Sequence, residues 1–377
     1  MTSHSKHRNV SIEILRIIAM FLVLACHGIL HLNWMLHVDS GLTPHPGWET
    51  ALSYLVVQYG QVGVCIFFMI SGYFLVKKSF NWKRIITPWA HVLVYTIGFF
   101  IIALLLPAAI KQFAGINVLF DTRAHIVETL VAVFTPISAS SYWFMTSYIA
   151  MLILSPYINT LFEHVSEHAM IGLIGFISLL SVLMLYWGRT NLFNHIFYAC
   201  LCYMIGGWMR VYLPAHRTWN RVQIFGAIIV ATVAMALFNF AAASQNSIIN
   251  ALTWNAQLKD GIWLGPVIVA ACLFLCAVKK QSPSRHTTFE SAIIAISPAT
   301  FGVYLLHENL FGYRLLWRTW EYLVPAPHTI LTKVAAYLAI LVVTYAVLLL
   351  AAYVMDRFIA NPISRFVGTK LAAVIKK

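Results

Sequence analysis

The first long apolar stretch of the chain carries an arginine and a histidine at a spacing that could support chemistry inside a membrane. Ten residues separate Arg16 from His27, and at about 100° per residue the two return to within about 20° of the same helix face. The rise between them is roughly 16 Å, about half the thickness of the hydrocarbon core. Ionisable residues inside a span are costly and mark functional sites by default. The pair therefore predicts a cation that can hold an anionic ligand and, three turns away, an imidazole that can take a proton from a hydroxyl.

The residues around this pair also allow a structural interpretation. Glu13 lies one turn before Arg16, where an ion pair would offset the burial of the arginine. A snorkelling arginine and a histidine hydrogen-bonded within the bundle would show the same spacing. His31 follows His27 by four residues, which is a spacing found in metal sites on helices, but the sequence offers no identifiable third ligand. Spacing alone leaves the catalytic and the structural interpretation open, and it does not favour a metal.

A second polar segment closes another apolar stretch directly before a basic cluster. Its polar and basic side chains are Ser71, Tyr73, Lys77, Lys78, Lys83 and Arg84. Membrane topology alone produces basic clusters of this kind. The sharper interpretation is a site for a phosphate-rich ligand on the cytoplasmic side, because guanidinium and ammonium groups bind phosphate.

The composition indicates a polytopic membrane protein. Of the 377 residues, 60% are hydrophobic and 10% are charged, whereas soluble domains carry about 25% charged residues. A helical span needs roughly 20 apolar residues. Ten segments meet this requirement, at about 10–32, 52–76, 86–110, 142–162, 169–187, 193–213, 222–243, 262–278, 291–311 and 331–355. We therefore expect an all-α integral membrane helical bundle with about ten transmembrane helices, forming a single domain over residues 1–377.

The net charge of +13 is explained by membrane topology and gives no reason to expect nucleic acid as a partner. With the N-terminus inside, 17 of the 25 Lys and Arg residues fall in segments on the cytoplasmic side and 7 fall in outer segments, while Arg16 lies within the first span. This bias follows the positive-inside rule. It predicts cytoplasmic N- and C-termini in a multi-pass protein of the cell (cytoplasmic) membrane, with the lipid bilayer as its partner.

An ordered set of motifs resembles the membrane acyltransferase 3 family. Arg16 and His27 match the family's signature, in which ten residues separate an arginine from a histidine. Further matching blocks are Ile12–Ala19, Gly63–Leu75, Arg84–Pro88, Tyr142–Phe144, Ser155–Pro156 and Thr300–His307. These blocks occur in the family's order, and the resemblance covers nearly the whole chain apart from residues 163–290.

The resemblance implies O-acylation, usually O-acetylation, of extracytoplasmic carbohydrates by cytoplasmic acyl-CoA. It places the family's arginine on Arg16 and its histidine on His27, which we expect to act as the general base. We expect the co-substrate acetyl-CoA to be bound by Ser71, Tyr73, Lys83 and Arg84, and the carbohydrate acceptor by Tyr142, Trp143, Tyr304, His307 and Glu308. Glu308 is also expected to orient His307 or His27. The resemblance implies no metal.

Two other classes of protein fit part of this pattern. A transporter or flippase for a glycan or a lipid-linked precursor would use Arg16 and His27 as a substrate or proton path, although the sequence lacks the internal symmetry common in transporters. A structural or sensor protein would leave the pair without a catalytic role. The motifs of a serine hydrolase, an ATP-driven pump and a zinc protease are absent from the sequence. Acyl transfer to a hydroxyl is the function that the pattern favours.

Overall fold

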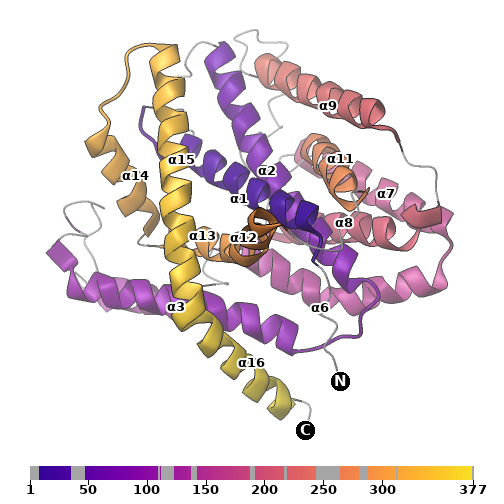
Figure 1. Ribbon diagram of the computed structural model, residues 1–377, viewed down its shortest axis with the longest axis horizontal. Helices are drawn as coiled ribbons and strands as arrows, with labels where there is room; N and C mark the ends of the chain where they lie inside the picture. The colour runs from indigo at the N-terminus through magenta and orange to yellow at the C-terminus, as the bar shows by residue number, and fades with distance from the viewer. Residues whose placement is uncertain are drawn as a thin grey trace.

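The computed structural model is a bundle of helices, and no strand occurs among the residues that it describes (Figure 1). It describes residues 8–34, 47–108, 111, 123–136, 142–186, 192–215, 219–242, 264–279, 287–310 and 312–375. Within these ranges, seven helices are long and apolar enough to cross a membrane, and two shorter apolar helices cover 167–181 and 264–279. The predicted all-α class is confirmed, and a helix overlaps each of the ten predicted spans. The number of helices that cross the bilayer and the cytoplasmic side of the termini stay predictions.

In chain order, the first described helices are α1 (Val10–His31), α2 (Gly47–Leu75), α3 (Lys83–Leu105), α5 (Arg123–Phe134), α6 (Trp143–His164) and α7 (Glu167–Tyr186). They are followed by α8 (Leu192–Val211), α9 (Arg221–Ala242), α11 (Leu264–Lys279), α12 (Thr288–Ile296), α13 (Thr300–His307), α14 (Gly312–Leu323), α15 (Ile330–Met355) and α16 (Asn361–Ile375). A 3-10 turn at Ser297–Ala299 joins α12 to α13 within one apolar segment, Thr288–His307.

Helices α1 and α2 pack closely because α2 carries glycines where the two backbones meet. A Cβ atom on Gly60 would lie 2.2 Å from the Cβ atom of Cys26, and one on Gly63 would lie 2.3 Å from the carbonyl oxygen of Ala19. Small residues at such positions let membrane helices approach closely and gain packing contacts. The order of the two contacts also shows that α2 runs antiparallel to α1.

Helix α15 crosses the bundle beside α1 in the opposite direction. The hydroxyl of Tyr337 donates to the carbonyl of Ala25, and the hydroxyl of Tyr345 donates to the carbonyl of Ile17 at 2.8 Å. The far end of α15 therefore lies toward the N-terminal end of α1. There the chain forms a π-helical turn, Asp356–Ala360, and continues as α16, which packs along α3 (Figure 1).

Helices α12 and α13 run along α1 in the same direction as α1. The hydroxyl of Ser297 donates to the carboxylate of Glu13 near the start of α1. Ten residues later, His307 contacts His27 toward the other end of α1. This parallel arrangement gives Glu13 and His27 each a partner from the same apolar segment.

Candidate functional site

A cavity of about 720 Å³ extends along the face of α1 that carries the arginine and the histidine. Its walls come mainly from α1, α2, α3, α6 and α13. Both Arg16 and His27 line it, as expected for two residues on one helix face. Toward Arg16 the lining includes Ser71 and His91, and toward His27 it includes Trp143. One continuous cavity thus connects the two residues that the sequence singles out.

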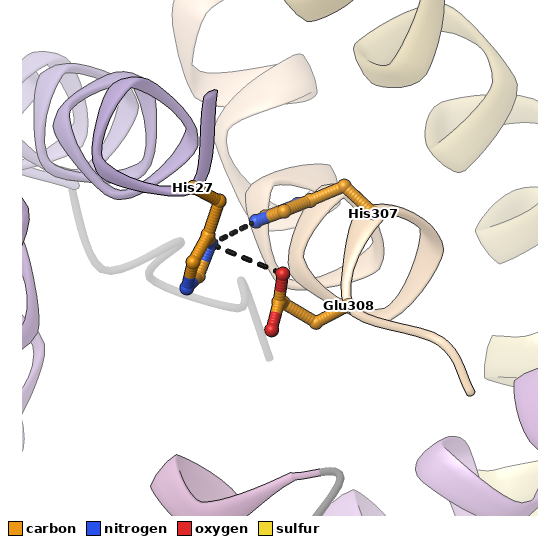
Figure 2. A group of neighbouring side chains, drawn as sticks. All are labelled: His27, His307 and Glu308. Carbon is orange, nitrogen blue, oxygen red and sulfur yellow. Dashed lines mark hydrogen bonds and ion pairs between the residues drawn. The ribbon is translucent and has the colours of Figure 1, made fainter. Parts of the chain in front are cut away.

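At one end of this cavity, three side chains from α1 and the end of α13 converge (Figure 2). The Nδ1 atom of His27 lies 2.9 Å from Nε2 of His307 and 3.4 Å from a carboxylate oxygen of Glu308. His307 is fully buried, and the side chains of His27 and Glu308 are 13% and 17% exposed. Figure 2 shows the second ring nitrogen of His27 pointing away from both partners.

The hydrogen bonds of His307 determine which nitrogen of His27 is free. The Nδ1 atom of His307 lies 2.7 Å from the carbonyl oxygen of Val303, and a carbonyl only accepts, so this nitrogen carries the proton. In the neutral ring the Nε2 atom of His307 is then an acceptor, and the Nδ1–H group of His27 donates to it. The Nε2 atom of a neutral His27 consequently keeps its lone pair and can accept a proton from a ligand.

Glu308 is the first residue beyond the apolar segment that ends at His307. Its carboxylate lies among the imidazoles of α1 and α13, 3.4 Å from Nδ1 of His27. A carboxylate oxygen of Glu308 lies 3.6 Å from Nε2 of His31. A carboxylate at this position can accept from either histidine of α1 and stabilise positive charge on it.

The same atoms also supply the metal ligands that the sequence did not reveal. Sequence reasoning found no third ligand beside His27 and His31, whereas the fold brings His307 and Glu308 to this end of α1. Ligand atoms of His27, His307 and Glu308 lie within 4.8 Å of one another, and zinc accepts such nitrogen and oxygen ligands. The arrangement can therefore act as a hydrogen-bond relay or hold a metal ion, and the two roles predict different responses to chelation.

At the other end of the cavity, Arg16 forms the ion pair predicted from the sequence. Its guanidinium lies 2.8 Å from the carboxylate of Glu13, which also accepts the hydrogen bond from Ser297. The side chain of Arg16 remains 24% exposed and lines the cavity. Because a guanidinium has five N–H donors, the ion pair leaves donors for an anionic ligand.

The residues predicted to bind acetyl-CoA do not all reach this cavity. Ser71 lines it, while its hydroxyl donates to the carbonyl of Phe67 within α2. The hydroxyl of Tyr73 instead accepts from Arg210, whose guanidinium also lies 5.1 Å from the centre of the tyrosine ring. Lys83 is exposed at the start of α3, and Arg84 donates to the carbonyl of Ser79. These three side chains flank the end of α2 outside the cavity lining.

The residues predicted to bind the acceptor also do not all line the cavity. Trp143 and Tyr304 line the cavity, and Trp143 packs against His195 with ring centres 4.5 Å apart. Tyr142 is almost fully buried and is absent from the lining. Its hydroxyl donates to the carbonyl of Leu305 and accepts from Asn309. Tyr142 therefore links α6 to α13 by hydrogen bonds and lies outside the lining of the cavity.

Sequence reasoning missed an ionisable pair in the wall of the cavity toward Arg16. The Nε2 atom of His91 lies 2.9 Å from a carboxylate oxygen of Asp356, which also accepts from the hydroxyl of Tyr95 at 2.7 Å. His91 and Asp356 are both buried and both line the cavity. The rule that singled out Arg16, an ionisable residue within an apolar span, would also have found His91.

Comparison with known proteins agrees with the motifs. Residues 9–353 match the family model described as an acyltransferase domain, which covers most of the chain. No curated protein and no solved structure is significantly similar to the chain. The match includes both ends of the cavity, from Arg16 and His27 to Tyr304 and His307. The chain belongs to the acyltransferase 3 family and is a membrane acyltransferase.

Proposed function

We propose that the protein transfers an acetyl group from cytoplasmic acetyl-CoA to a hydroxyl of an extracytoplasmic or cell-envelope glycan, with His27 as the general base. The observation that carries this proposal is the free Nε2 atom of His27 at one end of the cavity that Arg16 lines at the other. An alcohol is a poor nucleophile until its proton is removed, and imidazole is suited to that task near neutral pH. Transport alone would not require an oriented base.

The two ends of the cavity suit the two substrates. On the positive-inside rule, the Arg16 end of α1 would lie on the cytoplasmic side, where acyl-CoA is found. There the guanidinium of Arg16 and the nearby basic side chains Lys83 and Arg84 would attract the phosphates of the coenzyme. The thioester arm would extend along the cavity toward His27, so that the acetyl group alone is passed to the acceptor.

The acceptor would enter from the His27 end. Trp143 and His195 form an aromatic surface there, and amphipathic aromatic rings suit the apolar faces of sugars while leaving their hydroxyls free. Glu308 would stabilise the imidazolium that forms when His27 takes the proton. We therefore assign acceptor contacts to Trp143, and a positioning role to His307 and Glu308.

Label transfer from radioactive acetyl-CoA to the glycan fraction tests this proposal. Membranes that contain the protein are expected to incorporate label, and membranes with His27→Ala are not. The matched control is His164→Ala, which alters an exposed histidine at the end of α6 and should leave transfer intact. Both variants must be inserted and folded, as judged by size-exclusion elution in detergent. Transfer by His27→Ala at the wild-type rate contradicts the role of the base, and glycan flux without transfer supports transport instead.

A further inference from the structure

Two buried polar side chains in the cavity wall each have an oxygen atom without a hydrogen-bond partner. Gln61 and Tyr304 are 8% and 4% exposed, and both line the cavity together with His27. Within the described part of the chain, neither the carbonyl oxygen of the Gln61 amide nor the hydroxyl of Tyr304 is hydrogen-bonded. Buried polar groups are nearly always paired, and an unpaired one destabilises the protein that contains it. A ligand in the cavity would supply the missing partners.

Both side chains lie at the depth of His27, on different walls. Gly60, the neighbour of Gln61, is so close to Cys26 that a Cβ atom on the glycine would overlap it, and Cys26 precedes His27. Tyr304 lies one helical turn before His307, whose ring is hydrogen-bonded to His27. One unpartnered side chain therefore comes from α2 and the other from α13, with the free nitrogen of the base on α1.

Each of these side chains can donate a hydrogen bond into the cavity. The hydroxyl of Tyr304 has no partner among the described residues, so its O–H group is left to donate to a ligand. The unpartnered atom of Gln61 is the amide oxygen, which accepts. A half-turn of the amide brings its N–H donors to the same position, and in that orientation the side chain can bind an oxyanion. Donors aimed at the oxygen that becomes negative in acyl transfer are the usual means of stabilising the transition state.

We propose that the Tyr304 hydroxyl and the Gln61 side-chain amide bind the carbonyl oxygen of the thioester and stabilise the oxyanion formed on it. The inference rests on the proposed function. The acceptor oxygen bonds to the carbonyl carbon while its proton passes to Nε2 of His27, and the carbonyl electron pair moves to the oxygen held by these donors. The pair then returns, the carbon–sulfur bond breaks, and the coenzyme leaves as a thiol with the proton from His27.

Variants that remove one donor each separate this role from a structural one. Tyr304→Phe deletes the hydroxyl alone, and Gln61→Met removes the amide at similar volume. Each is expected to lower kcat by about 100-fold, as the loss of one oxyanion donor does in other enzymes, while KM for acetyl-CoA hardly changes. The melting temperature of Tyr304→Phe in detergent should equal or exceed that of the wild type, because no hydrogen bond is lost.

The matched control is Tyr345→Phe. Its hydroxyl donates to the carbonyl of Ile17 and lies outside the cavity lining, so this variant should lose stability and keep its kcat. The assay follows CoA thiol release from acetyl-CoA at a fixed amount of cell-surface glycan extract, together with incorporation of the label. If Tyr304→Phe and Gln61→Met keep the wild-type kcat, or if kcat falls in parallel with the melting temperature, this inference is overturned and the proposed function stands. Absence of transfer by the wild type overturns the proposed function and the inference with it.

Discussion

The Nδ1 atom of His27 lies 2.9 Å from the Nε2 atom of His307, although 280 positions separate the two residues in the chain. The carbonyl of Val303 orients His307, and His307 in turn orients His27. The lone pair at the end of this relay therefore depends on a residue in another helix. A base aligned in this way needs little rearrangement when the acceptor arrives.

Removal of His307 should reduce kcat less than removal of His27. His27→Ala deletes the base, and general base catalysis contributes about 10²–10⁴-fold. His307→Ala removes one hydrogen bond to the base, which corresponds to roughly tenfold in rate, because the Glu308 carboxylate, 3.4 Å from Nδ1 of His27, remains to accept from it. Steady-state measurement of kcat and KM for acetyl-CoA tests this order, with KM expected to change little.

The double variant His307→Ala/Glu308→Ala extends the same test. With both partners of Nδ1 removed, kcat should approach that of His27→Ala, because nothing then fixes which nitrogen of the ring is free. Equal rates in the wild type and the double variant would contradict the relay.

Chelation separates the relay from a metal centre built from the same atoms. If a hydrogen bond and not a metal ion joins His27 to His307, prolonged treatment with EDTA should leave acetyl transfer unchanged. Added zinc should inhibit transfer, because it would take the nitrogen and carboxylate ligands that the relay uses. The measurement is the rate of label transfer after dialysis against EDTA and after back-titration with zinc. Loss of activity on chelation that zinc restores would show that the three residues form a metal site.

The sequence predicts the parts of the site that depend on local geometry. Arg16 and His27 share a helix face because 3.6 residues complete each turn, and Glu13 pairs with Arg16 for the same reason. Long apolar stretches predict the helices because the bilayer requires internally satisfied backbones. These features need no knowledge of which helices are neighbours.

The remaining parts of the site depend on contacts between distant segments. Asp356 is 265 positions from His91, so its place beside the cavity follows from the crossing of α15 over α3 (Figure 1). Tyr142 was predicted to bind the acceptor. This motif residue at the start of α6 instead forms internal hydrogen bonds with Leu305 and Asn309. Gln61 could not be distinguished from other polar residues in spans until its lack of a partner was visible.

Asp356 should stabilise the fold through two donors at once. Its carboxylate accepts from His91 and Tyr95, and Asp356→Ala would leave both donors buried without a partner, at a cost of about 1–3 kcal/mol for each. Tyr95→Phe removes one donor and leaves the other bond intact, so its effect should be smaller. Denaturant unfolding in detergent micelles measures both. Equal stability of the two variants would contradict this account.

The contact between α2 and α8 gives a stability prediction with an internal control. A Cβ atom on Gly206 would lie 2.0 Å from the carbonyl oxygen of Met69, whereas one on Gly175 would meet nothing within 4 Å. Gly206→Ala should therefore force α8 away from α2 and cost about 1–3 kcal/mol, as overpacking of a close contact does. Gly175→Ala, in α7, should be neutral or stabilise by up to about 1 kcal/mol, because alanine is the better helix former. Thermal unfolding of the two variants in the same detergent measures the difference, and a Gly206→Ala protein as stable as Gly175→Ala would mean that the two helix backbones are not in contact at this point.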